Sequence, residues 1–148
     1  MMDAAAGGDA TALRANLKAG GCELEARDDE HGMTAFLWAC VKGSVECMQL
    51  LVDAGCDTAA TNDHGQTALM LTVSSGVPAA VRLVLHKGWC ELEARDVDGS
   101  TAFLASCHHG NVGCMKMLAD AGCDTATKNN QGQTALHQVA ASAMLAAL

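Results

Sequence analysis

Residues 132–137 read Gly-Gln-Thr-Ala-Leu-His, and the pattern Gly-x-Thr-Ala followed by Phe or Leu begins three further times, at Gly32, Gly65 and Gly99. These four glycines are 33, 34 and 33 residues apart. Two other glycine series keep the same period: Gly8, Gly43, Gly76 and Gly110, and Gly20, Gly55, Gly88 and Gly122. Self-similarity at such a period indicates a stacked repeat architecture. The 148-residue chain is therefore expected to consist of units of about 33 residues.

Each unit is expected to form two short helices followed by an extended loop. Residues 35–42 are apolar on most sides, as in a helix packed between neighbours, and Gly43 ends this stretch with a positive φ. Residues 44–54 form the second helix, with Ser44 as its N-cap; in the next unit Pro78 occupies the first turn, where a missing N–H costs nothing. Neither helix alone buries its apolar face, so neighbouring units must stack.

These motifs resemble the ankyrin-repeat family. Residues 132–137 are close to that family's Thr-Pro-Leu-His signature, and Leu50-Leu51-x-x-x-Gly55-x-Asp57 looks like the end of its second helix. The resemblance implies an all-α fold, an ankyrin-repeat solenoid of stacked helix-turn-helix units with hairpin-like loops. It implies a single domain over 1–148, with an N-terminal cap at 3–28, full repeats at 29–62, 63–96 and 97–129, and an incomplete repeat at 130–148.

The chain departs from the family pattern at a few positions. Alanine replaces the signature proline, and the signature histidine survives only as His137. In the family this histidine ties adjacent loops by hydrogen bonds, so cohesion between these repeats is expected to depend more on apolar packing. One repeat also carries an insertion, Trp89 after Gly88. We expect Trp89 to lie over a loop, the alternative being an anchor packed between the second and third repeats.

All eight cysteines follow the repeat registers. Cys22, Cys56, Cys90 and Cys123 share one register, Cys40 and Cys107 a second, and Cys47 and Cys114 a third. Equivalent sites in stacked units lie roughly 10 Å apart, beyond the ~7 Å limit between Cα atoms for a disulfide. Free cysteine behaves as a small buried hydrophobe. The sequence therefore predicts reduced, mostly buried thiols and a reducing compartment, the cytoplasm.

The sequence predicts no catalytic residues, no cofactor and no metal. It holds no glycine-rich phosphate loop, no Gly-x-Ser-x-Gly, no His-Glu-x-x-His and no Cys-x-x-Cys. The one metal-like cluster is Cys107-His108-His109, in which adjacent histidines on a helix point about 100° apart and cannot both join one tetrahedral site. The pairs Glu23/Glu25 and Glu91/Glu93 recur with the repeat and are expected to form a charged edge rather than an acid–base pair.

Charge and composition exclude two classes of partner. The formal net charge is −8, and only two tryptophans and two phenylalanines are aromatic, which disfavours nucleic acid. No apolar stretch reaches the ~18 residues of a membrane span, and the first residues lack the basic and apolar regions of a signal peptide. The acidity lies in residues 1–98, which hold 15 Asp or Glu and 7 Lys or Arg. A basic segment of another protein is therefore the favoured partner.

The leading hypothesis is a non-catalytic module or scaffold for protein binding. The resemblance implies contacts through a concave groove formed by the hairpin tips and the exposed face of the first helices. Carried over position by position, the hairpin residues are Asp29, Glu30, His31, Met33, Asp63, His64, Gln66, Val97, Asp98, Ser100, Asn130, Gln131 and Gln133. The helix residues are Val41, Lys42, Ser74, Ser75, His108 and His109. An enzyme or metal protein has little support.

The alternative hypothesis is a fragment of a larger repeat protein, or a piece that associates with a second copy. The sequence carries no charged residue after Lys128 and ends in a run rich in alanine and leucine. Apolar surface left uncovered usually marks a contact site. We expect self-association through Met144, Leu145 and Leu148, giving a homodimer through the C-terminal end.

Overall fold

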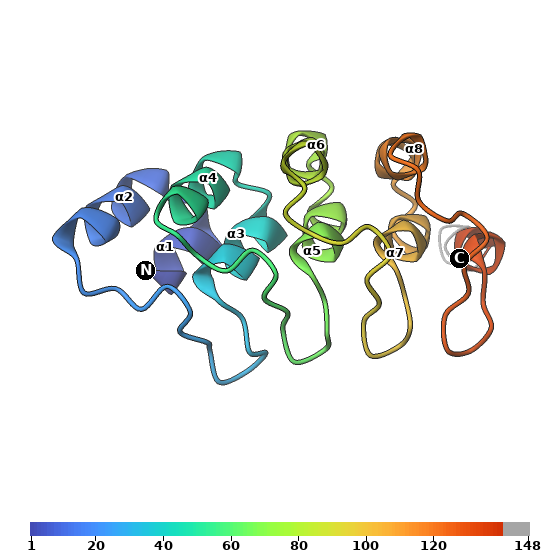
Figure 1. Ribbon diagram of the computed structural model, residues 1–148, viewed down its shortest axis with the longest axis horizontal. Helices are drawn as coiled ribbons and strands as arrows, with labels where there is room; N and C mark the ends of the chain where they lie inside the picture. Colours follow the sequence, from blue (N-terminus) through green and yellow to red (C-terminus); the bar gives the residue numbers. More distant parts are fainter. Residues whose placement is uncertain (141–148) are drawn as a thin grey trace, which may run out of the picture.

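The repeat period becomes a row of antiparallel helix pairs in the computed structural model, which describes residues 1–140 (Figure 1). Eight labelled helices follow one another: α1 Met2–Gly7, α2 Ala10–Ala19, α3 Ala35–Lys42, α4 Val45–Asp53, α5 Ala68–Ser75, α6 Pro78–Lys87, α7 Ala102–His108 and α8 Val112–Asp120. Residues 135–140 are also helical, and no strand occurs within residues 1–140. The predicted all-α solenoid is confirmed.

The helices form two layers. Figure 1 shows α1, α3, α5 and α7 in one row, with α2, α4, α6 and α8 in a second row, while the loops between pairs project to one side as hairpins. Helices of the first row contact their neighbours along the row, as α3 does with α1 and α5. Each pair therefore buries its apolar face against the next pair, as the repeat pattern predicts.

Short side chains fix where the helices begin. The threonine of the repeated motif is an N-cap: Thr34, Thr67 and Thr101 each accept a hydrogen bond from the backbone N–H three residues further on. Ser44 caps α4 in the same way, and Pro78 stands at the first turn of α6, so both predictions from the sequence are confirmed. Because the cap recurs every 33 or 34 residues, the repeat sets the register of the first helices.

The core lies between the two rows. Its largest fully buried side chains include Phe36, Leu37, Met48, Leu51 and Leu69. Cys40, Cys47, Cys107 and Cys114 are buried there as predicted, whereas Cys22, Cys56, Cys90 and Cys123 are half-buried. None of the helices within residues 1–140 combines the length and the hydropathy needed to cross a bilayer.

Polar contacts, not apolar packing alone, join the hairpins. Consecutive hairpins are linked by backbone hydrogen bonds: the N–H of Asp63 donates to the carbonyl of His31 over 2.9 Å, Val97 to His64 over 3.0 Å, and Asn130 to Asp98 over 2.9 Å. The expectation that cohesion depends mainly on apolar packing is therefore incomplete. The physical reason is that extended loops lying side by side form hydrogen bonds between their own backbone groups. These bonds do not need the signature histidine that most of the repeats lack.

Two arginines strengthen the hairpin row. Arg27 Nη1 donates to the carbonyls of Gly32 and Thr61, over 2.8 and 2.6 Å. Arg95 donates from Nη1 to the carbonyls of Gly99 and Lys128, over 2.6 Å each. Each arginine thus joins its own hairpin to the loop of the next repeat, and Arg95 adds a third hydrogen bond, from Nη2 to Thr127 Oγ1 over 2.6 Å.

Trp89 is a correction to the sequence prediction. Its side chain is half-buried and packs against the core, with its ring edge-on to that of Phe36. Trp89 is therefore a packed side chain, as in the alternative, but its aromatic contact with Phe36 joins the first and second predicted repeats and not the second and third. An indole is large enough to reach the buried aromatic ring of α3 from the turn after α6.

Candidate functional site

The inner row of helices presents one repeated face beside the hairpins. The fourth residue after each motif threonine lies on it, namely Trp38, Leu71, Ala105 and Gln138, together with the seventh, namely Val41, Ser74 and His108. Positions three apart share a face of an α-helix. With the hairpin side chains below them, these residues line two adjoining clefts, which together form the groove.

The first, which we call the apolar cleft, lies between α3 and α5. It has a volume of about 170 Å³ and is lined by His31, Met33, Trp38, Val41, Asn62, His64, Gln66 and Leu71. The indole N–H of Trp38 donates to Asp28 Oδ2 over 2.8 Å, which holds the ring in place. Backbone N–H groups of His31 and Met33, together with that indole, lower the pKa of Asp28 and keep it a charged acceptor.

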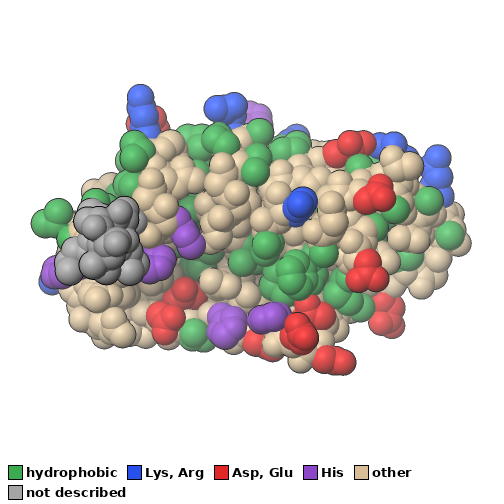
Figure 2. Space-filling model, turned by 180° about the vertical axis from the view of Figure 1, so that it is seen from behind, with side chains coloured by type: hydrophobic (Ala, Val, Ile, Leu, Met, Phe, Trp, Pro, Cys, Tyr) green, Lys and Arg blue, Asp and Glu red, His purple; other side chains and the backbone are tan. Residues whose placement is uncertain are grey.

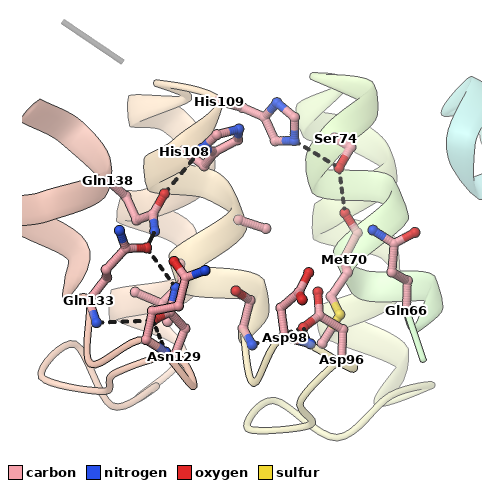
Figure 3. Close-up of a pocket in the computed structure, with 14 residues that line it drawn as sticks. Gln66, Met70, Ser74, Asp96, Asp98, His108, His109, Asn129, Gln133 and Gln138 are labelled. Atoms are coloured by element: carbon pink, nitrogen blue, oxygen red, sulfur yellow. Dashed lines mark hydrogen bonds between the residues drawn. The ribbon is translucent and has the colours of Figure 1, made fainter. Parts of the chain in front are cut away.

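The second, the polar cleft, lies between α5, α7 and the next hairpin (Figure 3). It has a volume of about 340 Å³ and is lined by Gln66, Met70, Ser74, Asp96, Asp98, Ser100, Leu104, Ala105, His108, His109, Asn129, Gln131, Gln133 and Gln138. Gln66, in the hairpin before α5, lines both clefts, so the two clefts adjoin at this residue.

Hydrogen bonds order the side chains of the polar cleft. His109 Nε2 lies 3.2 Å from Ser74 Oγ, and His108 Nδ1 lies 3.1 Å from Gln138 Oε1. Partial burial, and secondly the neighbouring His108, lower the pKa of His109. The hydrogen-bond partners of the two histidines thus come from different helices, Ser74 from α5 and Gln138 from the helical segment 135–140. The two imidazole ring centroids lie 5.4 Å apart. Figure 3 shows them above the carboxylates of Asp96 and Asp98, at the opposite end of the cleft.

The groove carries negative charge. Asp96 and Asp98 line the polar cleft, and no lysine or arginine is among the described residues that line either cleft. Seen from the side opposite to Figure 1, hydrophobic side chains gather near the middle of the face, with histidines and a band of acidic side chains towards the hairpin edge (Figure 2). The arrangement can bind an extended, uncharged or basic segment, because its walls are both apolar and acidic.

The structure places most of the predicted site residues in the groove or at its rim. His31, Val41, His64 and Gln66 line the apolar cleft, and Gln66, Ser74, Asp98, Ser100, His108, His109, Gln131 and Gln133 line the polar cleft. Asp29, Glu30, Asp63, Val97 and Asn130 are exposed at the hairpins, and Lys42 is exposed at the end of α3. The sequence therefore located the face on which the clefts occur.

Two predicted residues do not offer a free side chain. Met33 touches the wall of the apolar cleft but is only 3% exposed, and its Sγ accepts a hydrogen bond from Asn62 Nδ2 over 3.6 Å. Ser75 is half-buried, and its hydroxyl donates to the carbonyl of Thr72 over 2.6 Å and accepts from the N–H of Val77 over 3.2 Å. We therefore leave Met33 and Ser75 out of the candidate site.

Other groove residues escaped the sequence reasoning. Trp38, Leu71 and Gln138 line the clefts but were not singled out, and neither was Asp96. The signal was present for the first three, since each stands four residues after a motif threonine. Asp96 occupies the register of Asn62 and Asn129, whose side chains brace their own hairpins, so its place in the cleft depends on the shape of the loop.

The remaining chemical candidates have structural roles. Glu25 Oε1 accepts a hydrogen bond from the N–H of Asp57, and Glu93 Oε1 from that of Asp124, over 2.7 Å in each case. These carboxylates join one repeat to the next. Within residues 1–140, no group of three His, Cys, Asp or Glu side chains is placed to hold a metal ion.

The residues predicted for self-association, Met144, Leu145 and Leu148, lie outside the described residues. The helical segment before them exposes two large apolar side chains, Leu136 at 77% and Val139 at 40%.

Comparison with known proteins gives a family and several relatives. The family model described as Ankyrin repeats (3 copies) matches residues 1–96. The chain is 28% identical over 141 residues to the E3 ubiquitin-protein ligase KEG of Arabidopsis thaliana, a match that covers 93% of this chain and 8% of that protein. It is 31% identical over 140 residues to Inversin of Mus musculus, covering 90% and 13%. It is 26% identical over 121 residues to the human Neurogenic locus notch homolog protein 2, covering 82% and 5%. The matches thus cover between 5% and 13% of the length of these relatives.

Proposed function

This chain belongs to the ankyrin-repeat family, and from that premise we propose that it is a non-catalytic module that binds another protein through the groove. Ankyrin repeats generally mediate protein–protein interaction. The observation that carries the proposal is the pair of adjoining clefts, one apolar and one polar, which share Gln66. The ligase activity in the name of one relative belongs to that protein, because the match covers 8% of its length.

The partner we favour is a basic segment of a protein. The net charge of −8 and the acidic residues along the hairpin edge attract cations, and this attraction is weakened by salt. The eight free thiols suit a reducing compartment, so we place the interaction in the cytoplasm. The repeat boundaries stay a prediction; the family match ends at residue 96, which is the predicted end of the second full repeat.

Site-specific photocrosslinking tests the groove. A benzophenone side chain placed at Gln66 reports on the groove, and one placed at Lys116, exposed on α8, is the matched control on the outer row. In extracts of the source cell, we expect distinct crosslinked proteins from position 66 that disappear when Val41 is changed to Glu. The same crosslinked proteins from both positions, or none from position 66, would contradict binding in the groove.

Self-association is the second candidate. The exposed Leu136 and Val139 favour it, since both lie on the last helical segment described and present apolar surface to solvent. Sedimentation of the whole chain over a wide concentration range tests it, alongside Leu136→Glu. We expect concentration-dependent dimers that the substitution abolishes; a monomer at every concentration would reject the candidate.

A further inference from the structure

The two clefts of the groove differ in chemistry and lie one repeat apart. The apolar cleft is bounded by α3 and α5, and the polar cleft by α5 and α7. Neighbouring packed helices are about 8–10 Å apart. An extended peptide advances about 3.3 Å per residue. A peptide lying along the groove would therefore place side chains about three residues apart in the two clefts.

The apolar cleft fits one large apolar side chain. Its walls are the Trp38 indole, Val41 and Leu71, and its volume is about 170 Å³. A dry cavity of about 150 Å³ is sufficient for benzene. The Trp38 ring is already held by its hydrogen bond to Asp28, so little side-chain freedom is lost when a ligand packs on it.

The polar cleft fits a cation. Asp96 Oδ1 accepts the N–H groups of Asp98 and Ser100, both over 2.9 Å, and among residues 1–140 no hydrogen bond occupies its Oδ2. The Asp98 carboxylate is exposed beside it. Because the described lining of both clefts contains no Lys or Arg, no cation of the groove itself neutralises these two carboxylates.

We propose that the groove recognises a two-point linear motif: an extended segment with one large apolar side chain in the apolar cleft and, about three residues away, a Lys or Arg that pairs with Asp96 and Asp98. This inference rests on the proposed function of the groove and adds the chemistry and spacing of its partner. The apolar side chain supplies affinity by burial, and the cation fixes the position of the segment along the groove.

Selection from a random 12-residue peptide display library, with the full chain as bait, tests the motif. We expect enriched peptides to share a large apolar residue separated by three or four positions from Lys or Arg. Fluorescence anisotropy of one enriched peptide then measures the variants. Val41→Glu and Asp98→Lys should each weaken binding about tenfold or more. Asp120→Lys, the same charge reversal at an exposed position of α8, should change it less than twofold.

A charge swap makes the test specific. Changing the basic residue of the peptide to Glu should restore part of the binding to Asp98→Lys, because Asp96 stays acidic, and should weaken binding to the unmodified chain. Peptides that lose affinity with Val41→Glu but lack a basic residue, or ignore Asp98→Lys, would overturn the two-point motif while leaving groove binding intact. No enrichment, or peptides that bind all three variants equally, would overturn both the motif and the proposed function.

Discussion

The indole ring of Trp89 meets the ring of Phe36 edge-on, with centroids 5.8 Å apart and planes inclined by 73°. Phe36 is fully buried in α3, whereas Trp89 lies in the turn after α6, in the next repeat. The pair therefore joins two successive repeats through their aromatic rings. An inserted residue, which the period alone marks as an irregularity, contributes to packing between units.

Removing either ring is expected to weaken the contact between these repeats. Trp89→Ala should lower the free energy of unfolding by about 2–3 kcal/mol, less than the loss of a fully buried tryptophan because the side chain is half-buried. A double-mutant cycle with Trp89→Leu and Phe36→Leu should give a coupling of about 0.5–1.5 kcal/mol, typical of an aromatic pair. Denaturant unfolding measures both; additive single effects would show that the rings do not interact.

Periodic features of this fold were accessible from the sequence, and features set by loop shape were not. The helix pairs could be predicted from the spacing of glycines and apolar residues, because the same pattern occurs in each repeat. The role of Arg95 does not follow, since its partners Thr127 and Lys128 lie 32 and 33 residues away and are met only when the loops stack. In the groove, the position of Trp38 could be predicted from its place in the helical repeat, four residues after the motif threonine. The direction of the Asp96 side chain could not, because it depends on the shape of a hairpin turn.

Arg95 is expected to stabilise the hairpin row. Its guanidinium donates to Gly99 O, Lys128 O and Thr127 Oγ1, over 2.6 Å in each case. Because the side chain is exposed, we expect Arg95→Ala to cost about 1–2 kcal/mol, at the lower end for bonds to a charged group. Arg95→Lys should recover only part of the lost free energy of unfolding, since an ammonium group lacks the two planar nitrogens with which the guanidinium makes these bonds. Thermal unfolding, with Arg82→Ala on α6 as the control, checks this; equal losses at both positions would contradict the assigned contacts.

Gly99 and Gly88 form a matched pair of positive-φ glycines, at +74° and +64°. A Cβ at Gly99 would lie 2.9 Å from the backbone N of Asn130 in the next hairpin, whereas nothing lies within 4 Å of one at Gly88. Gly88→Ala should therefore cost only the left-handed conformation, about 1–2 kcal/mol. Gly99→Ala should cost at least about 1 kcal/mol more, because the next hairpin must shift. Chemical denaturation compares them, and identical losses would mean that the hairpins are not closely packed.

The cysteines should differ in reactivity by burial and by charge. Burial, followed by the nearby Glu25 and Asp57, raises the pKa of Cys56 to about 12. At pH 8 its thiolate fraction is then far below that of an ordinary cysteine, so alkylation should be slow in the native chain and increase about tenfold per pH unit. Mass-mapped iodoacetamide labelling measures this, with the unfolded chain, in which all eight thiols should react, as the control. Disulfides in the unfolded chain, or rapid native labelling of Cys56 at pH 8, would contradict the expectation.

His109 should make the fold less stable in mild acid. Its pKa is lowered from 6.5 by partial burial and by His108, while Asp96 and Asp98 line the far end of the same cleft. Since the unfolded chain binds the proton more readily, it gains protons first as the pH falls through about 6.5, and the free energy of unfolding decreases until His109 is also protonated in the native state. His109→Asn should remove this part of the decrease between pH 7.5 and about 5. His86→Asn, at an exposed position of α6, should leave it in place. Denaturant midpoints measured across this pH range test the prediction. If the midpoint of His109→Asn depends on pH as steeply as that of the unmodified chain, His109 is not the titrating group.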